Sequence, residues 1–249
     1  MFGVSRAPSA RQRNFWRPAV LDANVTSRAR IVIASCLAGA VASVALVAPA
    51  GGASRRPACS LTGSRTVLAT ASAKIMKKRG TLRAGQTSYP VTRWFGCRYR
   101  TNRRFRLAIV GEPGIFETRV TQARLAGPFA AVADQYSEPA GSDDHASITV
   151  RDLRTGRRAF TTSILPDNTS VLITDLVLAP GGRLAWIEQL TQFGSGPGMT
   201  KTSYEVHAVG ASGDQLLDSG PNIQPGSLAR AGKIVYWIRG GQARMAQAL

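Results

Sequence analysis

Acidic residues are scarce in this chain, and their placement is the first constraint on its function. The 249 residues include 32 lysines and arginines against 14 aspartates and glutamates, for a net charge of +18. No carboxylate stands between Asp22 and Glu112, and residues 54–111 hold 14 of the bases. Residues 112–249 are nearly neutral, with 12 bases and 13 acids. Positive charge concentrated in one stretch favours an anionic partner for that stretch.

Histidine is scarcer still, and the motifs of common enzyme classes are missing. His145 and His207 are the only two. Neither has companions at zinc-ligand spacing, so we predict no metal. There is no nucleophile elbow, no phosphate-binding glycine loop and no HExxH motif. Asp143 and Asp144 could contribute to a calcium or substrate site, but an ordinary polar loop is favoured because calcium needs six or more oxygens. We predict no catalytic residue and no cofactor.

The amino-terminal segment has the pattern of a secretory signal. An uncharged run follows Arg28 and Arg30 and ends in Ala48-Pro49-Ala50. A basic flank, an apolar core and small residues at the end are typical of cleaved signals. We therefore divide the chain into a basic extension (1–30), a signal core and cleavage region (31–53) and a mature domain (54–249). Cleavage is expected after Ala50 or Ala53, and an amino-terminal membrane anchor is the alternative.

Three cysteines are present, and export would leave two of them. Cys36 lies in the signal, whereas Cys59 and Cys97 remain in the mature chain. Two cysteines in an oxidising compartment predict one disulfide. The alternative is a pair of free, buried thiols.

Sequence patterns recur along the mature chain at a nearly constant spacing. "ITVRDLRTGRRAFTTSI" (148–164) repeats the pattern of "YRTNRRFRL" (99–107), which lies about 54 residues earlier. "GPFAAVADQ" (127–135) matches "GGRLAWIEQ" (181–189) at the same offset, and "KIVYWIR" (233–239) matches it again. Alternating β-formers between turn residues predict four strands in each unit of about 50 residues.

These repeats resemble a known group of secreted proteins. "LAPGGRLAWI" (178–187) resembles the turn and following strand of TolB-like and WD-type β-propeller repeats, and "VRDLRTGR" (150–157) resembles their outer two strands. Gly181 replaces the usual aspartate of the turn. The resemblance covers about residues 115–249. It implies a propeller-like fold and is silent on chemistry.

We predict an all-β fold made of four-stranded antiparallel units, in the manner of propeller blades. A degenerate unit covers about 60–112, two full units cover about 113–170 and 171–224, and a three-strand remnant covers 225–249. This amounts to about three and a half to four blades, incomplete or open. Closure of a ring would need the strand near 59–69 to complete the last unit.

Two carboxylates hold equivalent positions in successive units, Asp134 and Glu188. Equivalent positions in a propeller surround its axis, so these two side chains could meet at a central channel and supply the carboxylate pair that a glycosidase or lyase would need. Simple polarity at the ends of strands explains them without any chemistry, and we favour that interpretation.

The first unit contains an arginine-rich hairpin, "CRYRTNRRFRL" (97–107). If the turn preserves the alternation, four arginines share one face of the sheet: Arg98, Arg100, Arg104 and Arg106. A second basic cluster lies nearby: Lys77, Lys78, Arg79 and Arg83. Aromatic residues interleave with these charges as stacking platforms would: Trp94, Phe95, Tyr99 and Phe105. The hairpin would then bind an anionic polymer, whereas a solvated face above a core of aromatics is the commoner arrangement.

The favoured function is that of an exported, non-catalytic binding or scaffold protein of the cell envelope with an unknown ligand. In this interpretation the loops at 135–147 and 190–203 form a rim that carries specificity or receives a protein partner. The first alternative is a polyanion-binding envelope protein that binds cell-wall or other anionic polymers through the arginine face. The second is an enzyme with a carboxylate pair at the propeller axis. No sequence-specific recognition of nucleic acid is expected.

Overall fold

The computed structural model describes residues 59–249 except for 112–116, 138–143, 165–168, 195–199 and 211–212. All the regular secondary structure in this part of the chain is β-strand. It contains no helix that is long and apolar enough to cross a bilayer. The predicted signal segment, residues 1–53, lies outside the described residues.

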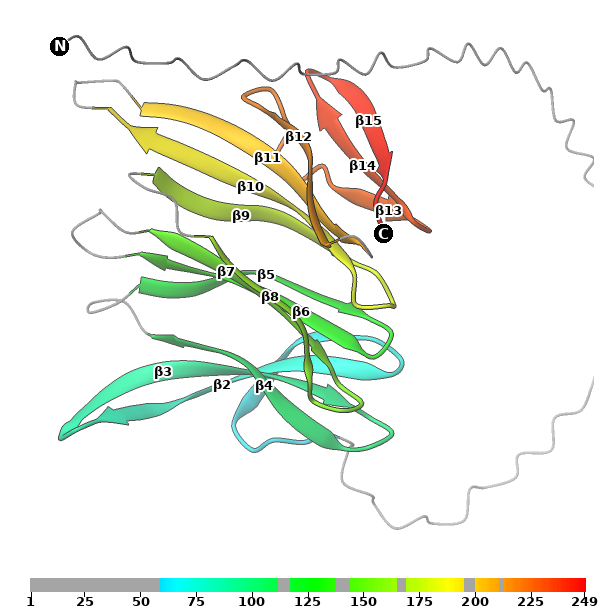
Figure 1. Ribbon diagram of the computed structural model, residues 1–249. Coiled ribbons are helices and arrows are strands. Elements are labelled where there is room, and N and C mark those ends of the chain that lie inside the picture. Colours follow the sequence, from blue (N-terminus) through cyan, green and yellow to red (C-terminus); the bar gives the residue numbers. More distant parts are fainter. Residues whose placement is uncertain (1–58, 112–116, 138–143, 165–168, 195–199, 211–212) are drawn as a thin grey trace, which may run out of the picture. The chain divides into compact units, whose positions relative to one another are not determined.

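The strands form four antiparallel sheets in chain order (Figure 1). The first sheet contains β1 (Ser64–Ala69), β2 (Ala73–Ala84), β3 (Thr87–Arg98) and β4 (Arg103–Gly111). The second contains β5 (Glu117–Ala126), β6 (Phe129–Ser137), β7 (His145–Asp152) and β8 (Arg158–Ile164). The third contains β9 (Thr169–Leu178), β10 (Leu184–Phe193), β11 (Thr200–Gly210) and β12 (Gly213–Gly220). The fourth contains β13 (Ala229–Ala231), β14 (Ile234–Arg239) and β15 (Gln242–Gln247).

This arrangement confirms the predicted all-β, open propeller-like fold and the order of its units. Three sheets have four strands and the last has three, as the repeat count predicted. None of the sheets described closes into a barrel. The strand near 59–69 has a different role from the one that ring closure would need, because β1 pairs with β2 and completes the first sheet.

Glycines in the left-handed conformation mark equivalent turns of the repeat. Gly127 and Gly182 have φ angles of 54° and 82°, and each precedes the second strand of its sheet. Gly182 therefore takes the role that the sequence alignment assigned to Gly181. Gly156, with φ of 82°, closes the β7–β8 hairpin. A side chain at Gly156 would also collide with the Phe105 ring of the first sheet, since its Cβ would lie 2.2 Å from Cε1. Only glycine meets both requirements.

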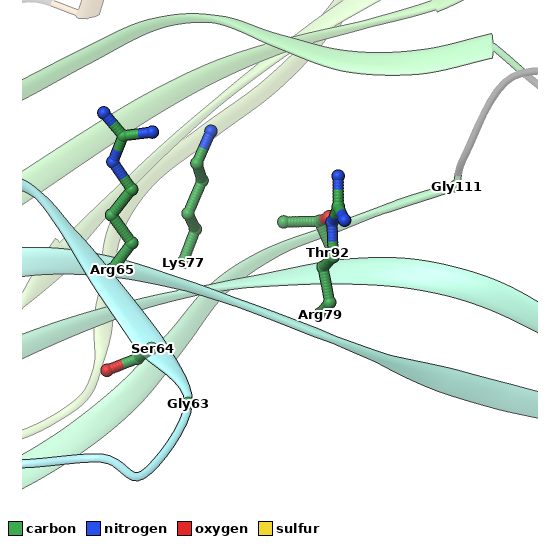
Figure 2. Close-up of a pocket in the computed structure, with 7 residues that line it drawn as sticks. All are labelled: Gly63, Ser64, Arg65, Lys77, Arg79, Thr92 and Gly111. Atoms are coloured by element: carbon green, nitrogen blue, oxygen red, sulfur yellow. The ribbon is translucent and has the colours of Figure 1, made fainter.

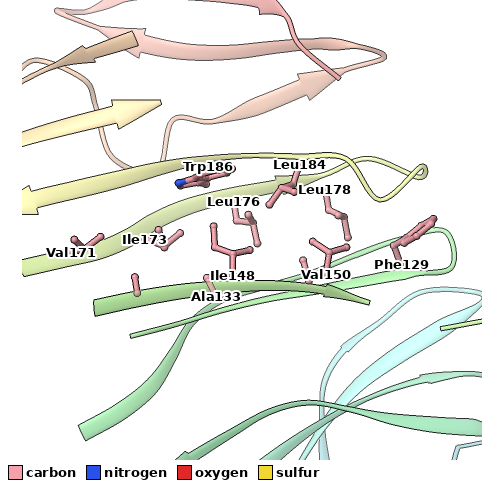
Figure 3. Packing of buried hydrophobic residues seen from close by; sticks show 12 residues of the cluster. Phe129, Ala133, Ile148, Val150, Val171, Ile173, Leu176, Leu178, Leu184 and Trp186 are labelled. Carbon is pink, nitrogen blue, oxygen red and sulfur yellow. The ribbon is translucent and has the colours of Figure 1, made fainter. Parts of the chain in front are cut away.

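Apolar clusters join each sheet to the next one in the chain. Residues of β6, β7, β9 and β10 form the cluster between the second and third sheets (Figure 3), with Trp186 and Ile148 among its fully buried members. A second cluster joins the first and second sheets, and a third joins the third and fourth. Strand β6 is buried on both faces, and its alanines at 130, 131 and 133 allow the neighbouring sheets to approach closely.

The predicted disulfide is present on the face of the first sheet that points away from the second sheet. Cys59 and Cys97 are bonded and fully buried, with Met76 beside them and Phe95 packed against the group. The backbone N–H of Cys59 donates to Oδ1 of Asn102 at 2.6 Å, which fixes the start of the sheet to the β3–β4 turn. A disulfide of this kind is typical of an oxidising, extracytoplasmic environment.

Candidate functional site: a basic pocket on the first sheet

A pocket of about 630 Å³ lies on the first sheet, where strands β1, β2 and β3 run side by side. Three cations line it, Arg65 from β1 and Lys77 and Arg79 from β2. Figure 2 shows these side chains rising on the same side of the ribbon. The remaining described lining residues are small or hydroxylated: Gly63, Ser64, Thr92 and Gly111. No described lining residue is a carboxylate, so the described part of the lining is basic.

The strand register explains why these cations converge. Arg65 pairs with Lys77 across β1 and β2, and Arg79 pairs with Thr92 across β2 and β3. Paired residues share a face, as do residues two apart along one strand. Ala73 and Ile75 precede Lys77 on this face and pack against the second sheet. The pocket therefore begins where the packed core ends.

Trp94 lies beside the pocket and contacts one of its cations. Lys77 Nζ is 5.7 Å from the centroid of the Trp94 ring, within the range of a cation–π contact. The indole is 8% exposed, and its N–H is a buried donor without a hydrogen-bond partner among the described residues. Lys77 is therefore positioned by an aromatic ring, and no described carboxylate neutralises its charge within the pocket.

The predicted arginine face is divided between the two sides of the sheet. Arg104 pairs with Cys97 and Arg106 with Phe95, which places these two arginines on the disulfide side. Arg98 pairs with Arg103 on the opposite side, and Arg100 lies in the turn between the strands. The expectation that all four share a face is therefore wrong. Their role in binding remains a prediction.

The two predicted lysines are also separated. Lys77 lines the pocket, whereas Lys78 is the next residue of the strand and points to the opposite face, where it pairs with Arg93. The four interleaved aromatic residues pack into the apolar clusters: Trp94, Phe95, Tyr99 and Phe105. Their placement agrees with the structural interpretation, in which these rings stabilise the sheet.

Asp134 and Glu188 do not converge on a common site. Asp134 shares its face of β6 with Val132, which packs toward the first sheet, and it accepts a hydrogen bond from Ser147 Oγ at 3.0 Å. Glu188 shares its face of β10 with Trp186, which packs toward the second sheet. The second sheet separates the two carboxylates. Burial raises the pKa of each of them, without any contribution from one to the other.

A smaller polar pocket of about 260 Å³ lies near the predicted rim, between the second and third sheets. Gln135 and Gln189, at equivalent positions in successive units, both line it. Arg119 donates two hydrogen bonds to Gln135 Oε1, at 3.1 and 2.9 Å. Asp144 accepts from Ser137 and Ser170 at 2.5 Å each. The Asp144 carboxylate is thus held in the wall of the pocket by these two hydrogen bonds. Residues 138–143 and 195–199 of the rim loops lie outside the described residues.

The structure also assembles a group that the sequence analysis missed. Glu205 precedes His207 by two residues in β11, and Glu188 on β10 is the ladder partner of Glu205. The three side chains place one ligand-type atom each within 4.8 Å of one another. Glu205 stands two residues before His207 and therefore shares its face of the strand, a spacing that was not weighed when no metal was predicted from the sequence; that prediction stays untested. The stretch Glu205-Val206-His207 is the feature of the sequence that could have revealed this group.

Comparison with known proteins adds little to this geometry. No family model matches the sequence, and no curated protein matches it. Among solved structures, the chain is similar to one described as the crystal structure of polysaccharide lyase Uly1, with 12% sequence identity and a TM-score of 0.43. The match covers 75% of this chain and 48% of the lyase, so the chain spans about half the length of that structure. A likeness at this level identifies neither a shared activity nor a shared ligand.

Proposed function

We propose that the protein is an exported, non-catalytic binding protein of the cell envelope, and that the basic pocket holds an anionic group of its ligand. The observation that supports this most directly is the convergence of Arg65, Lys77 and Arg79 on one pocket. Guanidinium and ammonium groups in this arrangement suit the carboxylate, sulfate or phosphate groups of a polymer. The volume lies within the range of about 300–1,000 Å³ that is usual for ligand sites.

The surrounding charge supports the same ligand class. Residues 54–111 contain 14 bases and no acid, so the sheet that holds the pocket would attract a polyanion over a longer range than the pocket itself. Lys74, Arg104 and Arg106, on the opposite face, would raise the association rate with little selectivity, since they converge on no described pocket. Selectivity would come from the pocket.

The non-catalytic part of the proposal is supported by the separation of the two candidate carboxylates, Asp134 and Glu188. Cleavage of a glycosidic bond by a pair of carboxyl groups needs both to flank one bond, about 5–10 Å apart. Asp134 and Glu188 pack toward different neighbouring sheets. Each is occupied locally, by Ser147 and by the Trp186 indole N–H respectively.

A second candidate site is the polar pocket near the rim. Its hydrogen-bonding side chains, Gln135, Gln189 and Thr191 among them, favour a neutral, hydroxylated ligand or a loop of a partner protein. The two candidates differ in their expected response to salt, because only binding to the basic pocket would release counterions from a polyanion.

The decisive experiment is a salt titration of binding with a matched pair of variants. Purified protein would be titrated with dextran sulfate, polyglutamate and polyphosphate, with neutral dextran as the control. Each ion pair formed contributes up to about 0.9 to the slope of log affinity against log salt. We expect Lys77→Gln to reduce the magnitude of the slope by up to about 0.9, which is the contribution of one ion pair. Lys78→Gln removes the same charge from the neighbouring residue on the opposite face and is expected to leave the slope nearly unchanged.

Two outcomes would contradict the proposal. If Lys77→Gln and Lys78→Gln weaken binding equally, the charge of the sheet attracts polymers without a defined site. If no charged polymer binds at low salt, the basic pocket is not a polyanion site. Retained binding to neutral dextran would then favour the rim pocket, and Gln189→Ala would be the next variant.

A further inference from the structure

The group centred on His207 has the geometry of a small metal centre. His207 Nε2 lies 3.0 Å from Glu205 Oε2 and 3.6 Å from Glu188 Oε1. Zinc bonds to imidazole nitrogen and carboxylate oxygen are about 2.0–2.2 Å long, so neighbouring ligands of a tetrahedral zinc lie about 3.3 Å apart. These two separations lie on either side of that value. All three ligand atoms lie within 4.8 Å of one another, so they surround a space that a single ion could occupy.

The strand register holds these ligands in place. Trp186 and Glu188 on β10 pair with His207 and Glu205 on β11, so the four side chains form a block on one face of the third sheet. The Trp186 and His207 rings stack, with centroids 5.0 Å apart and an angle of 9° between their planes. This stacking fixes the imidazole plane with Nε2 directed at both carboxylates.

The groups behind the ligands match the usual support of a metal site. The Trp186 indole N–H donates to Glu188 Oε2 at 2.9 Å, which leaves Oε1 directed at His207. His207 Nδ1 lies 3.4 Å from Asp214 Oδ1 on β12 and is a buried atom without a hydrogen bond. A ligating histidine commonly turns its second nitrogen toward a carboxylate in this way.

The balance of charge also favours a divalent cation. Three carboxylates face one imidazole, which neutralises at most one of them when protonated. Glu188 is 4% exposed. A cation between the ligands would stabilise the ionised form that burial disfavours.

We propose that His207, Glu188 and Glu205 bind one Zn²⁺ ion, with Asp214 orienting His207 and water completing the tetrahedron. An imidazole nitrogen in the set favours zinc over calcium or magnesium, which prefer oxygen ligands throughout. The side chains of Glu205 and Asp214 are 30% and 47% exposed, which gives the ion a path from solvent. The site is separate from the basic pocket and does not depend on the function proposed for it.

The test is a titration of the untagged protein, purified from cells expressing the full chain, with ZnCl₂ against a chromophoric chelator. We expect one zinc per chain. Glu188→Gln, Glu205→Gln and His207→Gln should each weaken binding at least 100-fold. His145→Gln is the matched control, because it removes the other histidine, which stacks on Tyr136 in the second sheet, and it should bind zinc as the parent does. Asp214→Asn should weaken binding about 10- to 100-fold.

A spectroscopic readout separates ligation from a purely structural role. Co²⁺ in place of zinc should give the visible absorption of a tetrahedral nitrogen–oxygen site and quench the fluorescence of Trp186, and both signals should disappear in Glu205→Gln. That variant removes a partly exposed carboxylate, so it is the ligand variant expected to keep its fold, which circular dichroism would verify. Absence of stoichiometric binding, or equal zinc affinity in Glu205→Gln and the parent, would overturn the assignment.

Discussion

The disulfide between Cys59 and Cys97 offers the most quantitative test of how this fold is held together. It joins residues 38 positions apart and fastens the segment before β1 to the end of β3. In the chain-entropy account, closing a loop of that length stabilises the native state by about 4 kcal/mol, mainly by restricting the unfolded chain. We therefore predict that the double variant Cys59→Ala/Cys97→Ala loses about 3–4 kcal/mol. For a domain of this size that corresponds to a fall in Tm of roughly 6–16 °C.

Urea unfolding of the parent and the double variant, followed by tryptophan fluorescence, would measure this difference. Asn102→Gly is the matched comparison, because glycine adopts the left-handed φ of 49° at this position while the variant removes the hydrogen bond from Cys59 N–H at the same corner and keeps the covalent link. It should lose only about 1 kcal/mol. The parent treated with a reductant should behave like the double variant. A loss below about 1 kcal/mol on removing the disulfide would refute the loop-closure argument.

Two further predictions concern aspartates that pack between sheets. Burial raises the pKa of Asp134 in the folded state above the ordinary aspartate value of 3.8. The free energy of unfolding therefore falls as pH rises from 3.8 through the raised folded value, and this loss of stability persists at neutral pH. Asp134→Asn should therefore be more stable than the parent at pH 7 and equal to it well below pH 3.8, which thermal unfolding across pH would verify; an unchanged difference would contradict the linkage. Asp175 accepts from the Leu228 N–H at 2.8 Å and from Arg124 at 3.2 Å. Asp175→Ala should lose about 1–3 kcal/mol, because it leaves the buried Leu228 N–H unpaired, whereas the Arg124 side chain is 39% exposed and its ion pair adds little. Asp175→Asn, which keeps one acceptor oxygen, should lose less, and equal losses in the two variants would show that packing decides the effect.

The repeat was readable from the sequence because it depends on local patterns. The 54-residue offset and the turn at Gly156 reflect one strand–turn–strand unit used several times, and β-formers alternating between turns determine each unit. The disulfide was also predictable, since only two of the three cysteines lie outside the predicted signal segment. These features need no knowledge of how distant strands align.

The site was harder to predict because it depends on register. The β3–β4 hairpin has four residues between Arg98 and Arg103. With an even number in the loop, an odd-numbered residue pairs with an even-numbered one, so Arg104 lies beside Cys97 and away from Arg98. Arg65 and Lys77 meet for a related reason, through a ladder that includes a β-bulge between Thr66 and Leu68. Alternation alone cannot reveal a bulge or a loop length.

The apolar clusters that join successive sheets have a consequence for how this domain opens. Each of the three clusters between sheets joins sheets adjacent in the chain, so the free energy of the domain is close to a sum of sheet terms and nearest-neighbour interface terms, as in a one-dimensional array. The fourth sheet has three strands and a single such interface, and β15 has exposed residues along most of its length. Amide hydrogens of β13–β15 should therefore exchange with solvent in smaller, more frequent openings than those of β6 and β10, whose exchange should require unfolding of the whole array.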